Sequence, residues 1–304
     1  MARNKISGVY AAVLTPRTDK DQIDGPALTR LVQFLMASGI SSFAVNGATG
    51  EFCLTTPAQL RTILAIVKEA SSGASEILCG VGAASASLAI ELAAIAEAEG
   101  VKALLLPMPY FFPYQQEDLD LFSRAVAAST SLPILLYNLP QFTSGLDKET
   151  VLALITDVPN IIGIKDSSGS LDILRHLTQH GVDVCRIVGN DSALAPALIE
   201  QVCDGVISGV ACVLPEAILA LYAQRHHAGS DEFRRAAQRL EEFIEQLNLF
   251  PTPWGLKWIA EARGLFRPTF AQPITSHRLA QSHDMAAWFA DWYPSVVPAA
   301  SIAE

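Results

Sequence analysis

A lysine at the end of an apolar run is the residue in this sequence best suited to chemistry. Lys165 follows the run Ile161–Ile164 and precedes Asp166 and a Ser/Gly cluster. Such a run is typical of a buried parallel strand, and Ser and Gly are typical of the loop that leaves it. Because an ammonium group is costly to bury, this position favours the neutral amine, which attacks carbonyl carbon. The residue therefore predicts a Schiff-base nucleophile, and a strand-end lysine that reaches solvent is the alternative.

Polar residues and glycines also follow other apolar runs. They are the segment Asn46-Gly47-Ala48-Thr49-Gly50-Glu51, Tyr137 with Asn138, Gly189-Asn190-Asp191 and Ser208-Gly209. Alternation along a strand places Tyr137 and Lys165 on the inward side, with Gly163 leaving room for a substrate below the lysine. The glycines around Ala48 and Thr49 permit a turn whose N–H groups bind a carboxylate.

The elements that must position these residues are short apolar runs separated by helical segments. The expected strands are Gly8–Leu14, Phe43–Asn46, Ile77–Gly82, Ala103–Leu106, Ile134–Asn138, Ile161–Lys165, Cys185–Gly189 and Gly205–Ser208. Alternation of strands and helices predicts a parallel sheet with right-handed crossovers. Eight such units predict a closed (β/α)8 TIM barrel, with functional residues at the carboxyl ends of its strands. A doubly wound sheet is the competitor, but Gly80-Val81-Gly82 lacks the third glycine of a dinucleotide fingerprint.

The pattern becomes wholly helical from about residue 231. Apolar stripes lie at Phe233 to Leu247 and at Leu256 to Ala260, and another helix is expected near His283 to Trp292. We therefore predict a catalytic barrel over residues 1–230 and a C-terminal helical extension over 231–304, packed on the barrel.

Composition excludes several classes of partner. The net charge of −10 argues against nucleic acid and against an anionic membrane surface, and no uncharged run is long enough to span a bilayer. The five cysteines include no CxxC pair, which favours a reduced, cytoplasmic protein. His176 and His180 have helical spacing but no acidic companions at the strand ends, so no metal site is expected.

Four segments together resemble the dihydrodipicolinate synthase / N-acetylneuraminate lyase family of pyruvate-handling class I aldolases. They are Gly47-Ala48-Thr49-Gly50-Glu51, Tyr137-Asn138-Leu139-Pro140, Gly163-Ile164-Lys165-Asp166-Ser167-Ser168 and Pro109-Tyr110 with Pro113. The resemblance covers nearly the whole chain. It implies a homotetramer arranged as a dimer of dimers, with neither a metal nor an organic cofactor.

The same resemblance implies a role for each site residue. Lys165 attacks the keto carbon of pyruvate or another 2-keto acid, and Tyr137 is the general acid/base. Thr49 orients Tyr137, and the N–H groups of Ala48 and Thr49 hold the substrate carboxylate. The resemblance also implies further substrate-binding positions, which are Gly189, Asp191, Ser208, Phe142 and Thr143. It places Phe111 at a subunit interface near the site.

This chain departs from the family pattern at four positions. Ala48 replaces a hydroxyl residue, and Phe111 replaces a tyrosine that reaches a neighbouring subunit's site. Phe142 stands where the synthases carry an arginine for the second substrate's carboxylate, and Ser192 replaces an acidic residue that suits sialic acid. Losing a bidentate guanidinium partner weakens recognition of a carboxylate.

These departures favour one reaction of the class. The leading hypothesis is reversible aldol cleavage of a 2-keto-3-deoxy sugar acid, or a related 4-hydroxy-2-keto acid, to pyruvate and an aldehyde. The alternatives are a 4-hydroxy-tetrahydrodipicolinate synthase or a 2-keto-3-deoxy acid dehydratase of the same family. A barrel that binds a keto acid as a non-catalytic sensor is the alternative from another class.

Overall fold

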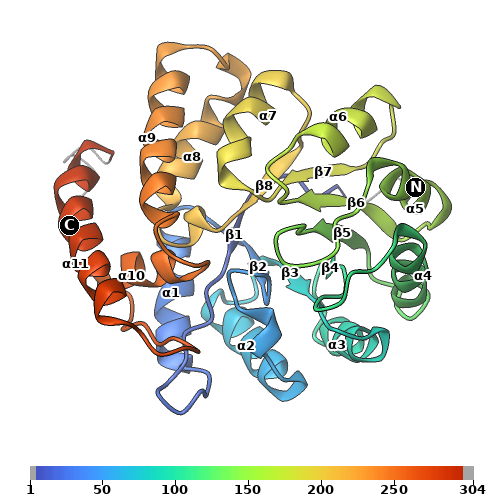
Figure 1. Ribbon diagram of the computed structural model, residues 1–304, viewed down its shortest axis with the longest axis horizontal. Coiled ribbons are helices and arrows are strands. Elements are labelled where there is room, and N and C mark those ends of the chain that lie inside the picture. The colour runs from blue at the N-terminus through green and yellow to red at the C-terminus, as the bar shows by residue number, and fades with distance from the viewer. Residues whose placement is uncertain (1–4, 297–304) are drawn as a thin grey trace.

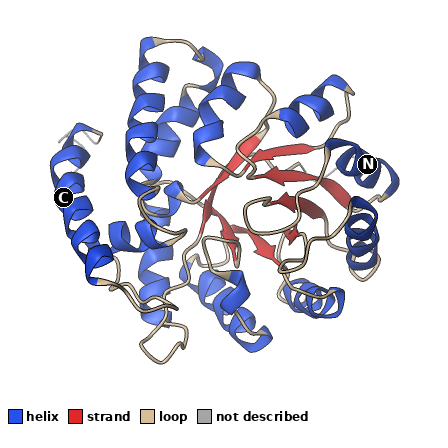
Figure 2. Ribbon diagram, in the orientation of Figure 1, coloured by secondary structure: helices blue, strands red, loops and turns tan. Residues whose placement is uncertain are grey.

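The computed structural model describes residues 5–296 and contains a closed barrel of eight parallel strands in sequence order. Helices surround the barrel (Figures 1 and 2). The strands are β1 Gly8–Ala12, β2 Ser42–Val45, β3 Glu76–Gly80, β4 Ala103–Pro107, β5 Ile134–Asn138, β6 Ile161–Asp166, β7 Cys185–Val188 and β8 Gly205–Ser208. The helices that follow them are α1 Gly25–Ala37, α2 Pro57–Ala70, α3 Ala86–Ala98, α4 Gln116–Ala127, α5 Lys148–Asp157, α6 Asp172–Gln179, α7 Leu194–Glu200 and α8 Pro215–Ala223. The predicted TIM barrel is confirmed, and each expected strand overlaps an observed one, with ends that differ by up to two residues.

Local sequence explains why the helices begin where they do. In α2, the Thr56 side chain accepts from the Gln59 N–H, and the Gln59 side chain accepts in return from the Thr56 N–H, which forms a capping box. Pro57 at the first position of the helix needs no hydrogen-bond partner for its nitrogen. The apolar face of α1 is buried, with Leu28, Leu31, Val32 and Leu35 among its inward residues.

The barrel encloses one apolar core and the helices cover a second. The interior core contains Tyr10, Leu78, Leu105, Leu135 and Ile207. The outer core lies between the other face of the strands and the helices, and includes residues such as Val45, Leu104 and Ile164. Successive strand residues thus alternate between the two cores, so each strand is buried on both faces.

A bulge between β5 and β6 changes one prediction made from strand alternation. Ile134 pairs with Ile161, whereas Leu135 pairs with Gly163, so the register shifts by one residue. Gly163 does not leave room for a substrate, because a Cβ there would lie 2.0 Å from the Cys185 carbonyl oxygen. The expectation of a substrate space at Gly163 is therefore wrong. The glycine instead allows close approach of β6 and β7.

The C-terminal helices gather on one side of the barrel, beside α1 and α8 (Figure 1). They are α9 Asp231–Leu247, α10 Trp254–Ala262 and α11 Ser276–Trp292. Helix α9 contacts α8, and α10 contacts both α9 and α11. The start of α9 agrees with the change of pattern near residue 231, while the division into two domains stays a prediction.

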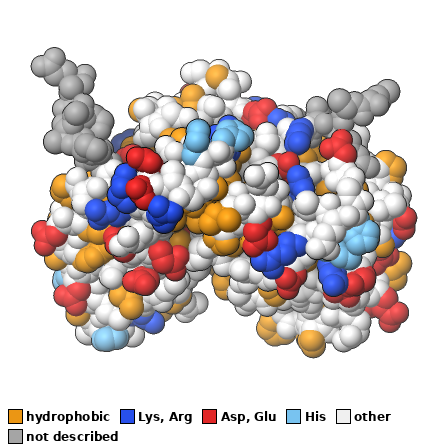
Figure 3. Space-filling model, turned by 90° about the horizontal axis from the view of Figure 1, so that it is seen from above, with side chains coloured by type: hydrophobic (Ala, Val, Ile, Leu, Met, Phe, Trp, Pro, Cys, Tyr) orange, Lys and Arg blue, Asp and Glu red, His pale blue; other side chains and the backbone are white. Residues whose placement is uncertain are grey.

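The distribution of charges on the surface and the free state of the cysteines agree with the inferences drawn from the composition. On the face seen in Figure 3, basic and acidic side chains are interspersed, and no extended basic surface covers it. Within residues 5–296, no helix is long and apolar enough to cross a membrane. The five cysteines are free, and Cys79, Cys185 and Cys212 are buried, where burial raises the pKa of the Cys79 and Cys212 thiols to about 12. These buried thiols behave as small hydrophobic groups.

Candidate active site

A cavity of about 340 Å³ lies at the carboxyl ends of the strands. Its walls come from the loops after β2, β5, β6, β7 and β8, and from the end of α9 through the first turn of α10. Parallel strands bring their carboxyl ends to one rim of a barrel, so residues far apart in sequence meet there. The cavity therefore collects polar side chains from the ends of four strands, β2, β5, β6 and β7, while the end of β8 adds apolar residues and a glycine.

Lys165 and Tyr137 face each other in this cavity. They are paired across β5 and β6, and their side chains are 3% and 2% exposed. The Lys165 Nζ lies 4.0 Å from the centre of the Tyr137 ring. A primary amine and a phenol thus occupy one buried space, as their strand positions predict.

Hydrogen bonds join the ends of the two strands that carry this pair. Asn138 Nδ2 donates to Asp166 Oδ1 at 3.0 Å, and Asn138 Oδ1 accepts from the Leu146 N–H at 3.1 Å. The Ser167 N–H donates to the Asn138 carbonyl at 2.9 Å. Asn138 and Asp166 therefore hold the loops on either side of Lys165 without lining the cavity themselves.

The loop after β2 brings Ala48 and Thr49 to the cavity wall. Asn46 begins the loop in the left-handed region, with φ of 54°, and its Nδ2 donates to the Gly80 carbonyl at 2.8 Å. Gly80 is required there, because a Cβ would lie 2.0 Å from the Asn46 carbonyl oxygen. The loop is thus held against β3, and the orienting role of Thr49 toward Tyr137 stays a prediction.

Asp191 places a buried carboxyl in the wall of the cavity that holds Lys165. Its Oδ2 accepts from the Val210 N–H at 3.1 Å, while its Oδ1 is buried and has no hydrogen-bond partner. Burial raises the pKa of Asp191 above its ordinary value, although hydrogen bonds from Ser208, Val210 and Gly209 and the charge of Lys165 lower it. This unpaired oxygen belongs to a residue of the cavity wall, and a substrate-binding role for Asp191 stays a prediction.

Ser167 is a cavity residue to which the sequence analysis assigned no role. Its hydroxyl is buried without a hydrogen-bond partner. A Cβ on Gly189 would lie 2.1 Å from Ser167 Oγ and 2.6 Å from Lys165 Cε, so the hydroxyl and the lysine stem share the space beside that glycine. The sequence feature that could have identified Ser167 as a site residue is its position two residues after Lys165, in the Ser/Gly cluster at the end of the strand.

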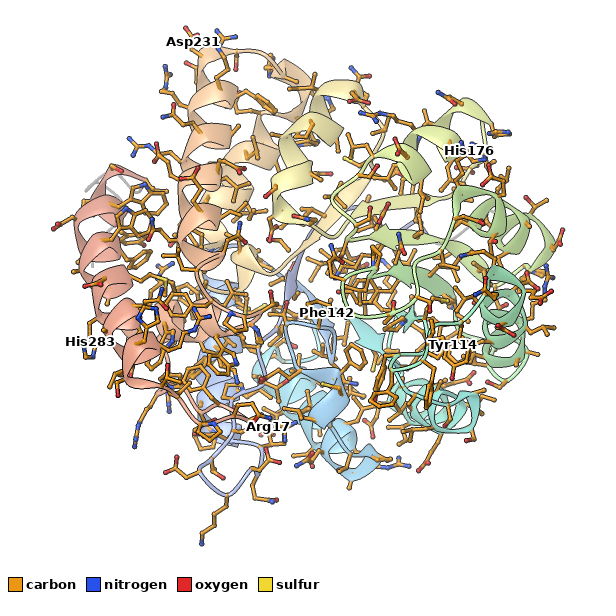
Figure 4. All side chains as sticks on the ribbon, viewed as in Figure 1. Arg17, Tyr114, Phe142, His176, Asp231 and His283 are labelled. Carbon is orange, nitrogen blue, oxygen red and sulfur yellow. The ribbon has the colours of Figure 1, made fainter. Side chains whose placement is uncertain are left out.

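The remaining predicted residues divide into two groups. Gly189 and Phe142 line the cavity, and Phe142 is 54% exposed at its mouth (Figure 4). Thr143 and Ser208 do not line it: Thr143 Oγ1 donates to the Leu139 carbonyl at 3.1 Å, and Ser208 Oγ accepts from the Ala211 N–H at 2.8 Å. Ser208 contributes indirectly through its hydrogen bond to Asp191.

Phe111 and the histidines lie outside the cavity. Phe111 is 86% exposed and forms an edge-on pair with Phe112. His176 and His180 are adjacent rings on and just after α6, and Figure 4 shows His176 and His283 on opposite sides of the molecule. Within residues 5–296, no three His, Cys, Asp or Glu side chains are grouped as a metal site.

Comparison with known proteins places the chain in a family. The model of the dihydrodipicolinate synthetase family matches residues 5–289. A 4-hydroxy-tetrahydrodipicolinate synthase of Porphyromonas gingivalis is 31% identical over 268 residues, covering 88% of this chain and 90% of the relative. One from Sorangium cellulosum is 32% identical over 277 residues, covering 90% and 92%.

Solved structures agree with the barrel and its extension. The dihydrodipicolinate synthase of Acinetobacter baumannii complexed with pyruvate has a TM-score of 0.88 at 25% identity, covering 96% of this chain and 100% of that one. The N-acetylneuraminate lyase of Mycoplasma synoviae has a TM-score of 0.83 at 20% identity, covering 94% and 97%, and shares the fold. With the family model matched across nearly its whole length, the chain belongs to the dihydrodipicolinate synthetase family.

Proposed function

We propose that the protein is a lyase that joins or separates a 2-keto acid and an aldehyde through a Schiff base on Lys165. One observation carries the proposal: a buried lysine amine lies 4.0 Å from a buried tyrosine ring in a cavity of about 340 Å³. Membership of a synthetase family supports an enzyme over a sensor barrel.

The chemistry proceeds through the amine of Lys165. The amine adds to the keto carbon, and loss of water gives a cationic iminium. In cleavage, the C3–C4 electron pair moves toward the iminium nitrogen, which leaves an enamine and releases the aldehyde. In condensation, the enamine attacks an aldehyde by the reverse path. After cleavage, the enamine takes a proton at C3 from Tyr137, which holds the proton of the C4 hydroxyl, and becomes an iminium; in condensation, the enamine forms from the pyruvate iminium by loss of a C3 proton. Hydrolysis of the final iminium releases the keto acid and regenerates the amine.

Tyr137 moves the protons in this scheme. Its hydroxyl protonates the departing carbinolamine hydroxyl and later takes the proton from the C4 hydroxyl. The N–H groups of Ala48 and Thr49 hold the carboxylate of the keto acid, and Thr49 orients Tyr137. Gly189, which has no Cβ, makes room for the stem of Lys165 and the hydroxyl of Ser167 beside the substrate.

Four further residues act on the aldehyde portion of the substrate. Asp191 and Phe142 contact it directly. Ser208 acts through Asp191, and Thr143 supports the loop that carries Phe142.

The reaction supported best is the synthase alternative and not the sugar-acid cleavage first expected. The curated relatives reported above are named 4-hydroxy-tetrahydrodipicolinate synthases, and the A. baumannii structure is complexed with pyruvate. We therefore place condensation of pyruvate with aspartate semialdehyde first.

One observation favours the aldol cleavage as a second candidate. Among the described residues that line the cavity, Lys165 is the only basic side chain. Phe142 offers no partner for a second carboxylate, whereas Asp191 Oδ1 and Ser167 Oγ offer hydrogen-bonding atoms to a hydroxylated substrate.

Borohydride trapping tests the class. Pyruvate with borohydride, in the presence of a chelator, is expected to leave a reduced pyruvyl adduct on Lys165 that peptide mass mapping locates. Lys165→Arg should abolish the adduct while the thermal transition persists. No adduct on the folded wild type would contradict the proposal.

The acceptor is then identified by comparing kcat/KM for aspartate semialdehyde with that for a neutral hydroxyaldehyde. A higher value for aspartate semialdehyde supports the synthase, and a higher value for the hydroxyaldehyde supports the aldol reaction. The cytoplasmic location and the homotetramer stay predictions.

A further inference from the structure

A buried ion pair joins the loop after β2 to helix α10. Lys257 Nζ lies 2.6 Å from Glu51 Oε2, and their side chains are 3% and 9% exposed. Among the ion pairs of residues 5–296, it is the only one in which both side chains are less than a tenth exposed. Burying two charges is costly even when they are paired, so stability alone does not account for this pair.

Each member of the pair lies within two residues, along the chain, of a residue in the cavity wall. Glu51 follows Thr49 by two residues, and Leu256, which precedes Lys257, lines the same cavity as Thr49. A Cβ on Gly209 would lie 3.3 Å from both Leu256 Cδ1 and Thr49 Oγ1. The start of α10 and the loop after β2 therefore approach each other at the end of β8.

Other bonds hold the two partners in place. Lys257 Nζ also donates to the Thr269 carbonyl at 2.8 Å, and Thr269 Oγ1 donates to the Arg17 carbonyl at 2.9 Å. Arg17, labelled in Figure 4, donates from Nη2 to the Leu54 carbonyl at 3.3 Å, in the short helix that follows Glu51. This series of hydrogen bonds thus connects Lys257 to the same loop after β2 that carries Glu51.

The backbone of the loop needs such support. Glu51 is in the left-handed region, with φ of 56°, which residues other than glycine adopt at a cost. Gly50 before it is tightly enclosed, since a Cβ would lie 3.1 Å from both Thr15 Oγ1 and the Val13 carbonyl oxygen. A loop with this conformation persists when its surroundings hold it.

We propose that Glu51 and Lys257 are positioning residues that aim the N–H groups of Ala48 and Thr49 at the carboxylate of the 2-keto acid. This inference rests on the proposed function. The carboxylate is held throughout the reaction, so the pair contributes equally to substrate and transition-state binding. Its loss therefore raises KM for the keto acid and leaves kcat nearly unchanged.

The test uses Glu51→Gln, Lys257→Met and the double variant E51Q/K257M. We expect KM for pyruvate to rise about tenfold or more, because small misplacements of binding groups have large effects. We expect kcat to change less than about threefold. Each single variant leaves one buried charge unpaired, which is strongly destabilising. The double variant removes both charges, so it tests the proposal in the case that a single variant does not fold.

A matched control is the double variant E216Q/R263M. Arg263 Nη2 lies 2.8 Å from Glu216 Oε1 and ties the end of α10 to α8, away from the loop. This variant is expected to keep the wild-type KM. An equal rise in its KM would show that general attachment of α10 matters, and would contradict the proposal.

Amide hydrogen exchange of the segment 46–54 provides a readout that needs no activity. Faster exchange in E51Q/K257M, but not in the control, supports the proposal, whereas unchanged exchange and unchanged KM overturn it. If wild-type protein is trapped by pyruvate and the double variant behaves as wild type, the proposed function stands and the positioning role fails. If wild-type protein is not trapped, the proposed function fails and the exchange data still decide whether the pair holds the loop.

Discussion

Two residues that line the cavity each carry a buried polar atom without a hydrogen-bond partner in the protein: Ser167 Oγ and Asp191 Oδ1. An unpaired buried polar atom costs about 1–3 kcal/mol. Both residues line the cavity, so a bound substrate can supply the missing hydrogen bonds. At the scale of single residues, these two unpaired atoms therefore lower the stability of the site.

Tyr137→Phe is expected to separate Schiff-base formation from turnover. The ring keeps its packing, but the hydroxyl that transfers protons is lost, and such a group contributes about 10²–10⁴-fold to the rate. The pyruvyl adduct on Lys165 should still form under prolonged borohydride trapping. Steady-state kinetics and mass mapping measure the two effects, and wild-type kcat in the variant would exclude Tyr137 as the acid/base.

Gly189→Ala is expected to prevent the adduct while the barrel stays folded. The new Cβ would lie 2.1 Å from Ser167 Oγ and 2.6 Å from Lys165 Cε, so it displaces side chains and not the backbone. Gly25→Ala, where the nearest atom is Ile66 Cδ1 at 3.3 Å in another part of the molecule, serves as the control. Circular dichroism and trapping yield compare the variants, and full trapping in Gly189→Ala would contradict this account of the space beside Lys165.

At the scale of elements, charged side chains at the amino ends of the strands hold the barrel together, whereas the reactive residues lie at the carboxyl ends. Asp204, just before β8, accepts from the Arg186 N–H at 2.9 Å and from Arg186 Nε at 3.1 Å. Its carbonyl accepts from the Gly8 N–H and from the Tyr222 hydroxyl. Asp204 therefore connects β7, β8, β1 and α8 at the end of the barrel opposite the cavity.

Asp204→Asn is expected to reduce the free energy of unfolding by about 2 kcal/mol at pH 7, through loss of charge-assisted hydrogen bonds. Burial alone would raise the pKa of Asp204, but hydrogen bonds and charge from Arg186 lower it overall. The stabilisation is therefore complete above the unfolded pKa of about 4 and is lost as pH falls through the lower folded value.

Urea unfolding at several pH values measures this effect. The difference between wild type and Asp204→Asn should shrink below about pH 4. The control Glu232→Gln removes a highly exposed ion pair with Arg235 and should change stability by less than about 1 kcal/mol. A pH-independent difference for Asp204→Asn would show that its charge is not responsible.

At the scale of the whole molecule, the clearest unexplained surface feature is an aromatic pair in the loop after β4. Phe111 and Phe112 are 86% and 62% exposed, with ring centres 4.9 Å apart. Phe111 has φ of 85°, which is unfavourable for a bulky residue. Exposed aromatic side chains of this kind suit an interface between subunits.

We expect the protein to form a homotetramer that Phe111→Asn weakens. Asparagine tolerates the left-handed conformation, so the variant removes the aromatic contact and keeps the backbone. Leu121→Asn, at another exposed apolar position, is the control. Light scattering across a dilution series should show dissociation of Phe111→Asn at higher concentration than wild type. A monomeric wild type would contradict the expectation.

The sequence by itself determined the barrel and its two main reactive residues. Alternating apolar runs and helical stripes are short-range patterns, so strands such as Ile134–Asn138 and Ile161–Asp166 could be located within a residue or two. Parallel pairing then requires the residues that end neighbouring strands to meet at one rim. For this reason Lys165 and Tyr137 could be brought together without coordinates.

Only the tertiary structure decided what surrounds that pair. The bulge at Ile162, the unpartnered hydroxyl of Ser167 and the burial of Asp191 depend on spacing between strands that no local pattern encodes. The pairing of Glu51 with Lys257 joins residues far apart in the chain through the packing of α10 on the barrel. Such contacts arise from the relative placement of whole elements, so the shape and electrostatics of the cavity follow from the fold and not from the motifs.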